Sequence, residues 1–355
     1  MARVRDFRRE VDNVTSLHET YDNYSTTFFA AFGRSHCETR SNASEVRPIR
    51  SSYSAVAVVR ESVIASRLLA MTAQFLAGGP VAEAVLSDAR ERVEALKKDG
   101  VTVGLGTILV GDDGPSASYV KNKHKTCEAV GITSHHKEIP AEAGQQALID
   151  ALNEFNDDPN VHGYILQLPL PDGFDAAEAL ALIDPAKDAD GLHPENLGKL
   201  VLQEPGPLPC TPAGIIEMLK FYDIEVAGKN VVVVGRGTTL GRPMALLMTT
   251  KQPGANAATT VVHTGVPDIS TYTKEADIVI AAVGRPGTIT KDMVKPGAVV
   301  VSGGISWEGK KLLPDVNEDV GEVASWITPR LGGVGPLTVA MLLANTVAAA
   351  ERARS

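Results

Sequence analysis

From Met71 onward, apolar runs of strand length alternate with helical stretches, and this alternation leaves few possible folds for the chain. Short strands separated by helices are typical of βαβ units, in which helices cover both faces of a parallel sheet. We therefore predict an α/β protein with a parallel sheet in its first half. The expected strands are Leu105–Val110, Ile132–Ile139 and Gly163–Leu168, and the expected helices are Ala82–Lys98, Ser118–Val130, Ala143–Phe155 and Ala176–Ile183.

The second half repeats the same alternation after a new helix start at Thr211-Pro212. Threonine is a good N-cap, and proline suits the first helical position because its missing N–H would have no partner there. We predict a helix over Pro212–Tyr222 that leads into a second α/β unit, and a long C-terminal helix over Leu337–Ala353. The expected strands of this unit are Val231–Val234, Thr260–His263, Ile278–Val283 and Ala298–Val301. At 355 residues, two domains are expected.

Residues 1–70 differ in composition from the rest of the chain. They contain ten Arg and no Lys, and they show little apolar periodicity outside Ala55–Leu69. A transit peptide is poor in acidic residues, whereas this stretch carries eight Asp and Glu, so that interpretation is weak. We interpret the stretch as a disordered extension or as translated sequence upstream of a start at Met71, because its apolar pattern could not build a core.

Charge and cysteine content exclude several classes of function. The net charge of -9 argues against nucleic acid or an anionic membrane surface as the main partner, since either would select clustered Lys and Arg. No apolar stretch reaches the ~20 residues that span a bilayer. The three cysteines lie far apart, without the spacing of a zinc site, so we expect no metal and reduced thiols in a cytoplasmic protein.

A glycine-rich segment, Gly235-Arg236-Gly237-Thr238-Thr239-Leu240-Gly241, follows the strand Val231–Val234. Glycines let the backbone approach a pyrophosphate, and the N-terminus of the next helix offers free N–H groups. The GxGxxxG spacing departs from GxGxxG, and a structural tight turn could use the same glycines. The position between a strand and a helix favours a dinucleotide site.

Charge near this turn indicates which dinucleotide is used. NAD-selective sites place an acidic residue at the end of the second strand, whereas here that strand ends Val262-His263-Thr264. Arg236 lies inside the glycine turn, where a guanidinium can pair with a 2′-phosphate. The sequence therefore favours NADP, with the alternative that Arg236 is an ordinary solvent-facing arginine.

Polar residues in the first half suggest a second site. Tyr119 and Lys123 share one face of a predicted helix, although such a pair can also be a partly exposed aromatic residue beside an extended lysine. The YxxxK spacing occurs in short-chain dehydrogenases, but there it follows the cofactor glycines, and here it precedes them. Gln167 ends an apolar strand, where a parallel sheet faces its ligand. Asp188 and Asp190 are equally consistent with a solvated turn.

The elements VGDDGPSASYVKNK, HGYILQLPLP, DPAKDADG, PCTP, VVVVGRGTTLGRP and GGVGPLTVAMLL occur in this order. Together they resemble the bifunctional methylenetetrahydrofolate dehydrogenase/cyclohydrolase family, over about four-fifths of the chain. The resemblance implies a two-domain α/β fold with a parallel-sheet catalytic domain, a Rossmann-like NADP-binding domain and a C-terminal helix that returns to the first domain. The implied catalytic domain is 71–211, joined by helix 337–355, and the implied cofactor domain is 212–336.

The resemblance also implies roles for individual residues. Tyr119 would stack on the folate, Lys123 would be the catalytic lysine, Gln167 would position it, and Asp190 would bind the pterin. The residues implied to contact NADP are Gly235, Arg236, Gly237, Thr264 and Ile305, and those implied to line the substrate site are Gly332, Gly333, Val334 and Gly335.

The implied activity is oxidation of 5,10-methylenetetrahydrofolate with NADP, followed by hydrolysis of the methenyl product to 10-formyltetrahydrofolate. The partner would be a tetrahydrofolate-derived small molecule, and the protein a cytoplasmic homodimer serving purine, methionine and histidine biosynthesis. Two alternatives stay open from the residues alone: a shikimate-dehydrogenase-like NADP enzyme of similar architecture, and a catalytically inactive folate-binding protein.

The chain departs from the family pattern at three places. Arg330-Leu331 stands where the family usually has a Pro before the glycines, and Ser302 stands in a strand that usually carries an Asp. Pro314 precedes Asp315-Val316, where Gly-Asp-Val is usual. None of these changes removes a residue implied to be catalytic, and they bear on the nicotinamide pocket and on the rigidity of the loops.

Overall fold

The structure is a computed structural model that describes residues 73–111, 123–309 and 311–354. The extension predicted for residues 1–70 and the predicted position of Tyr119 lie outside these ranges. Within the described residues, no helix is long and apolar enough to cross a membrane.

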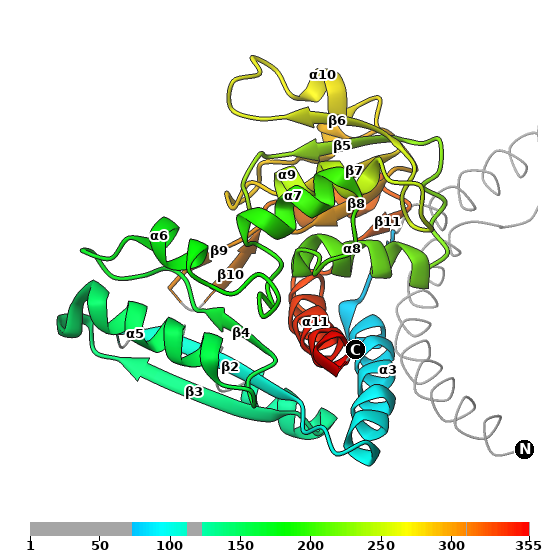
Figure 1. The fold of residues 1–355 in the computed structure, drawn as a ribbon. Coiled ribbons are helices and arrows are strands. Elements are labelled where there is room, and N and C mark those ends of the chain that lie inside the picture. The colour runs from blue at the N-terminus through cyan, green and yellow to red at the C-terminus, as the bar shows by residue number, and fades with distance from the viewer. Residues whose placement is uncertain (1–72, 112–122, 310, 355) are drawn as a thin grey trace, which may run out of the picture. The chain divides into compact units, whose positions relative to one another are not determined.

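The first half contains a three-stranded parallel sheet in the order β3-β2-β4 (Figure 1). Its strands are β2 (Gly104–Val110), β3 (Thr133–Ile139) and β4 (Gly163–Leu166). All seven residues of β2 are buried, as expected for the central strand of a sheet covered on both faces. The strand order reverses at β2, so the carboxyl ends of β2 and β4 form a switch point, where open α/β sheets bind ligands.

Helices alternate with these strands along the chain, as predicted. The helices of the first half are α3 (Gly78–Lys98), a helical segment at 123–130, α5 (Gly144–Asp157), α6 (Ala176–Ala181) and α7 (Pro194–Leu202), with a 3₁₀ turn η1 (Ala141–Ala143) before α5. The sequence did not predict α7, which His193 begins by accepting the N–H of Glu195 with its ring Nδ1 at 3.1 Å. A histidine cap followed by Pro194 is a weaker signal than Ser, Thr, Asp or Asn.

Five strands of the second half and β1 from the start of the first half form a six-stranded parallel sheet in the order β1-β11-β8-β7-β5-β6. The predicted strands are present as β5 (Asn230–Val234), β6 (Ala258–Val262), β7 (Ile278–Ala281) and β8 (Val299–Ser302). The edge strands β1 (Gln74–Phe75) and β11 (Trp326–Ile327) have two residues each, too short for a periodic pattern to reveal. The strand order reverses at β5, which creates a second switch point.

The remaining elements of this half are helices, 3₁₀ turns and a separate pair of strands. They are α8 (Cys210–Phe221), α9 (Gly241–Met248), α10 (Ser270–Thr273), α11 (Gly335–Arg354), the 3₁₀ turns η2 (Lys291–Met293) and η3 (Glu318–Glu322), and an antiparallel pair of strands, β9 (Ile305–Glu308) and β10 (Lys311–Pro314).

One local prediction was wrong. Helix α8 begins at Cys210 with Pro209 as its N-cap, and neither Thr211 nor Pro212 takes the predicted capping position. The Thr211 hydroxyl instead lies 3.0 Å from the Thr338 hydroxyl of α11. This contact comes from a residue 127 positions away in the chain, so a local capping rule could not anticipate it.

The C-terminal helix α11 returns to the first half, as predicted, and lies beside α3 (Figure 1). Val339, Leu343 and Val347 of α11 are buried in one apolar cluster with Val93 of α3 and Leu105 of β2. Burial of large apolar side chains contributes about 1.5–3 kcal/mol each, so this helix stabilises the first sheet.

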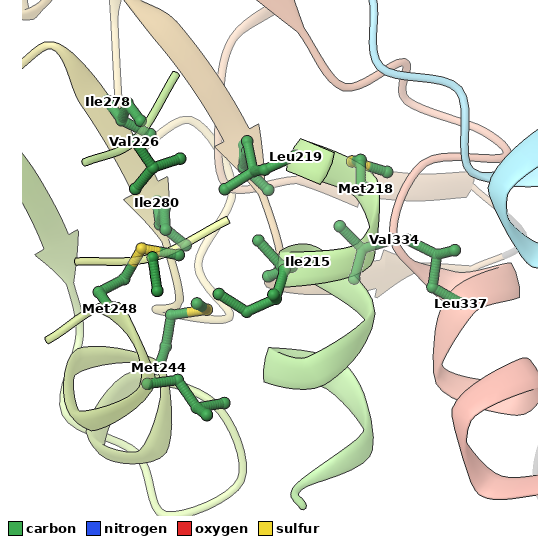
Figure 2. Close-up of a cluster of buried hydrophobic side chains, with 14 of the residues drawn as sticks. Ile215, Met218, Leu219, Val226, Met244, Met248, Ile278, Ile280, Val334 and Leu337 are labelled. Carbon is green, nitrogen blue, oxygen red and sulfur yellow. The ribbon is translucent and has the colours of Figure 1, made fainter. Parts of the chain in front are cut away.

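The start of α11 also contacts the core below the second sheet. Figure 2 shows Ile215 and Leu219 of α8 together with Met244 of α9 and Ile280 of β7. Leu337 at the start of α11 belongs to the same buried cluster. Helix α11 therefore contributes side chains to the apolar clusters of both halves.

Candidate functional site

Lys123 is placed at the first switch point by the helical segment 123–130 that follows β2. Its side chain is only 5% exposed, and its Nζ donates to Oε1 of Gln167 at 3.3 Å. Gln167 directly follows β4, which ends at Leu166, two residues earlier than predicted. Because β2 pairs with β4, residues that follow these two strands meet at one edge of the sheet.

The Gln167 side chain has a fixed orientation. Its Nε2 donates to the carbonyl of Leu168 at 2.8 Å, which leaves Oε1 as the acceptor that faces Lys123. Its backbone N–H donates to the carbonyl of Ile108 at 2.9 Å, so the residue stays attached to β2 after the strand assignment ends. Gln167 is therefore well placed to orient the lysine amine.

A cavity of about 200 Å³ lies in front of this pair. It is lined partly by apolar residues, such as Ile165 and Leu342, and partly by polar ones. We call it the Lys123 cavity. The polar residues that line it include Lys123, Gln167, Asp188, Asp190, Thr211 and Thr239. Apolar walls with a few convergent polar groups are typical of small-molecule sites.

The two aspartates that looked equivalent in sequence have different environments. The Asp188 carboxylate is buried and accepts the N–H of Gly191 at 3.0 Å, the N–H of His193 at 2.8 Å and Nδ2 of Asn196 at 2.9 Å. These bonds hold the loop that carries Asp190. Asp190 has no such set of backbone donors among the bonds described and lines the Lys123 cavity. Sequence reasoning missed this positioning role of Asp188.

Burial and charge shift the titration of the site. Burial lowers the pKa of the Lys123 ammonium, and the negative charge of Asp190 partly opposes that shift. Burial also raises the pKa of the Asp190 carboxyl group, which the Lys123 charge opposes. A lysine with a lowered pKa is neutral in a larger fraction of molecules at a given pH, as a proton acceptor requires.

The second site lies at the reversal of strand order beside β5. Gly235 has φ 122°, and a Cβ there would lie 2.1 Å from the carbonyl oxygen of Ala282, so this position requires glycine. A Cβ on Gly241 would lie 2.6 Å from the carbonyl oxygen of Gly235, so the start of α9 packs tightly against the turn. The glycines thus allow a compact strand–turn–helix unit, in which the Arg242 N–H at the start of α9 donates to the carbonyl of Gly237 at 3.0 Å.

A cavity of about 530 Å³ opens beside this turn, and we call it the glycine-turn cavity. Its lining brings together Gly235, Arg236, Gly237 and Thr264 with residues that follow β7, including Val283 and Arg285. The lining residues that the structure describes include no Asp or Glu, which fits a cavity for an anionic group. Ile305, at the start of β9 and 49% exposed, is not among these lining residues.

The predicted glycine loop before α11 has packing roles. The carbonyl of Gly332 accepts the N–H of Gly78 at 2.7 Å, and Val334 is buried in the core with Leu337. Gly335 is the first residue of α11. None of Gly332, Gly333, Val334 and Gly335 is among the residues that line the Lys123 cavity, so their contact with substrate stays a prediction.

No metal site is built by the part of the chain that the structure describes: it holds no group of three or more His, Cys, Asp or Glu side chains that could bind an ion.

Two parallel sheets, a buried lysine at one switch point and a glycine turn at the other define a two-domain α/β enzyme with a dinucleotide-binding fold. Two family models match the chain: the tetrahydrofolate dehydrogenase/cyclohydrolase catalytic domain over residues 76–190, and the NAD(P)-binding domain of the same enzymes over residues 209–354. The chain belongs to the tetrahydrofolate dehydrogenase/cyclohydrolase family.

Similar proteins cover both halves. The bifunctional protein FolD of Syntrophotalea carbinolica is 67% identical over 285 residues, which span 80% of this chain and 98% of that protein. The crystal structure of the bifunctional enzyme FolD from Campylobacter jejuni is 41% identical, with a TM-score of 0.75 over 79% of this chain and 99% of that one. The Trypanosoma brucei enzyme, solved with NADP and an inhibitor, is 37% identical, with a TM-score of 0.75 over 80% and 99% of the two chains.

Proposed function

We propose that this protein oxidises 5,10-methylenetetrahydrofolate to the 5,10-methenyl form with NADP, and hydrolyses that product to 10-formyltetrahydrofolate. The observation that carries the proposal is the buried Lys123 amine, which Gln167 orients beside Asp190 in the Lys123 cavity. The alternatives of a shikimate-dehydrogenase-like enzyme and an inactive folate-binding protein are not favoured, given 67% identity to a bifunctional relative and the presence of all three side chains.

In this proposal, Asp190 binds the pterin and the glycine turn binds NADP. The pyrimidine edge of a pterin presents an amino group and a ring N–H side by side, which one carboxylate can accept together. The residues Gly235–Gly237 would hold the pyrophosphate, and Arg236 with Thr264 would face the 2′-phosphate. When bound, NADP accepts the hydride that leaves the methylene carbon. The task of the protein in this step is to hold the two reactants in register.

Thr239 supports the idea that the two ligands meet. It belongs to the glycine-rich segment Gly235–Gly241 and also lines the Lys123 cavity. A residue shared between the glycine turn and the Lys123 cavity supports a proposal in which the cofactor lies next to the substrate. This adjacency is what direct hydride transfer requires, because the reacting atoms must approach closely.

Lys123 acts in the second step. Water adds to the methenyl cation, and the neutral Lys123 amine accepts the proton that the water loses. Gln167 orients the amine through its hydrogen bond, and the Asp190 carboxylate stabilises the ammonium that forms. The positive charge of the methenyl group would lower the pKa of Lys123 further, so the substrate itself favours the base form of the lysine.

The direct test is an absorbance assay that supplies methylenetetrahydrofolate and NADP and follows NADPH, with a second assay that supplies methenyltetrahydrofolate and follows its hydrolysis. The proposal expects both reactions. Reduction of NADP with shikimate and not with the folate would overturn it in favour of the related dehydrogenase class.

We also propose a cytoplasmic location, a homodimeric assembly, and a supply of one-carbon units to purine, methionine and histidine biosynthesis. Support comes from the sparse cysteine content, which is typical of a reducing compartment, and from the family to which the chain belongs.

Cofactor choice gives a specific prediction. Arg236→Ala should weaken NADP binding by about 1–3 kcal/mol, the range for loss of a charge-assisted contact, and leave NAD binding nearly unchanged. The measurement is the Kd of each cofactor by titration. Arg242→Ala is a matched control, because Arg242 lies on α9 next to the turn but does not line the glycine-turn cavity. Equal losses for NADP and NAD would show that Arg236 does not recognise the 2′-phosphate.

The lowered pKa of Lys123 predicts the pH dependence of hydrolysis. Below this pKa the amine is protonated and cannot accept a proton, so the enzymatic rate should rise with pH and reach a plateau below the ordinary titration range of lysine. The measurement is kcat for methenyltetrahydrofolate hydrolysis against pH, with the spontaneous hydrolysis subtracted. A rate that still rises in parallel with hydroxide concentration through that range would contradict the role of Lys123 as the base.

A further inference from the structure

The second half contains a buried carboxylate that the proposed mechanism does not use. Asp315 follows β10 and has no exposed surface. Its Oδ2 accepts the N–H of Val283 at 2.7 Å and the N–H of Gly284 at 3.0 Å, and its Oδ1 accepts the N–H of Arg285 at 2.8 Å. Three successive backbone amides are therefore held by one side chain from a distant part of the sequence.

These three residues form the loop that follows β7, at the carboxyl edge of the six-stranded sheet. Val283 and Arg285 line the glycine-turn cavity together with Gly235 and Arg236. The Asp315 carboxylate lies behind this wall, since it bonds to the amides of the loop and is not itself among the lining residues. The side chain can therefore control the shape of the wall without touching a ligand.

Asp315 also connects this loop to the one that follows β8. Its own N–H donates to the carbonyl of Gly304 at 3.3 Å, and the Ser306 hydroxyl donates to the carbonyl of Gly284 at 2.7 Å. A Cβ on Gly304 would lie 2.0 Å from Oδ2 of Asp315, so the two loops pack in direct contact. The loops after β7 and β8 thus form one hydrogen-bonded unit around the carboxylate.

The number of acceptors explains why this position needs a carboxylate. Three N–H groups converge on two oxygens, and an ionised carboxylate offers only acceptors. An asparagine of the same shape has one oxygen and one NH₂ group, so at least one backbone N–H would face another donor. Buried donors without partners are unfavourable, and the loop would move to satisfy them.

We propose that Asp315 is a positioning residue for the dinucleotide: it fixes the loop 283–285 in the conformation that binds the cofactor. This inference rests on the proposed function. It assigns to Asp315 an effect on cofactor binding alone, because the carboxylate contacts neither Lys123 nor the loop that carries Asp190 in any bond described.

The bifunctional chemistry separates this role from a general effect on folding. Hydrolysis of methenyltetrahydrofolate uses no dinucleotide, so it reports on the Lys123 cavity in the same protein sample. Asp315→Asn should raise the KM for NADP about 10- to 100-fold, the range for a lost hydrogen bond to a charged group. The KM for methylenetetrahydrofolate and the kcat of hydrolysis should stay unchanged.

Asp277→Asn is a matched control. Asp277 precedes β7 at the opposite edge of the sheet, where its carboxylate also accepts a backbone N–H, that of Asn230 at 2.8 Å. Asp277 also pairs with Lys295, and its side chain is 36% exposed. This variant alters a carboxylate that holds a backbone amide away from the glycine-turn cavity, and it should keep the wild-type KM for NADP. A rise in KM with Asp277→Asn equal to that with Asp315→Asn would overturn the assignment, because it would indicate a general loosening of the sheet.

Other outcomes decide the remaining cases. If the unaltered protein does not reduce NADP with methylenetetrahydrofolate, the proposed function fails. If it does, and Asp315→Asn keeps the wild-type KM for NADP or loses both activities in parallel, only the positioning role fails. If Asp315→Asn does not fold, Ser306→Ala provides the test, because it removes only the contact with Gly284. This variant should raise the KM for NADP by a smaller factor. An unchanged KM for NADP would overturn the positioning role.

Discussion

Replacing Lys123 with Gln is expected to reduce cyclohydrolase activity about 10²–10⁴-fold, the usual contribution of a positioned general base. Dehydrogenase activity should fall much less, since hydride transfer requires no base at the methylene carbon. Glutamine keeps much of the side-chain length and can still form hydrogen bonds, but it has no amine that can take a proton. The variant should therefore accumulate methenyltetrahydrofolate when it is given methylenetetrahydrofolate and NADP.

Following both reactions in one purified variant provides the measurement. Lys125→Gln is a suitable control, because Lys125 lies two residues later on the same helical segment and is exposed. If Lys123 only binds the substrate, both activities should drop in parallel, with a raised KM and no build-up of the intermediate. That pattern would rule out its role as the base.

Asp190→Asn is expected to lower kcat/KM of both reactions by roughly 100-fold or more, because two charge-assisted hydrogen bonds to the pterin are replaced by at most one neutral bond. The amide would also present an NH₂ group to a donor of the pterin. Lys123→Gln should therefore separate the two activities, whereas Asp190→Asn should reduce both together.

The same variant has a predicted effect on the pH profile. The charge of Asp190 raises the pKa of Lys123 against the effect of burial, so removing that charge should move the rise of the hydrolysis rate to lower pH. Steady-state kinetics across pH, with the exposed Asp172→Asn as control, provides the measurement. An unchanged folate KM, or a shift of the profile to higher pH, would contradict the proposed position of Asp190.

The long, strongly patterned elements of the fold were predictable from the sequence. Apolar runs such as Val231–Val234 and Leu105–Val110 specify buried strands wherever they occur, and their alternation with helices specifies parallel sheets. Two strands that were missed, β1 and β11, are too short to show a pattern of their own. They have two residues each, and they form because β1 pairs with β11 and β11 pairs with β8.

The candidate site was predictable in its members but only partly in their arrangement. Lys123, Gln167 and Asp190 were all named from the sequence, and they line one cavity. Tyr119 lies outside the described residues, and its stacking on the folate stays a prediction. Asp188 could not be distinguished from Asp190, because two aspartates in one short acidic segment look alike until their hydrogen-bond donors are known.

By itself, the sequence determined the long strands and helices and the position of the glycine turn, because these depend on local patterns of apolar residues and on backbone freedom. Only the tertiary structure decided which polar groups share an environment. Asp315 accepts amides about thirty positions away, and Thr211 meets Thr338 across 127 positions. The pKa of Lys123 is lowered by burial, which depends on everything packed around it. Such properties arise from contacts between distant segments, so no local pattern encodes them.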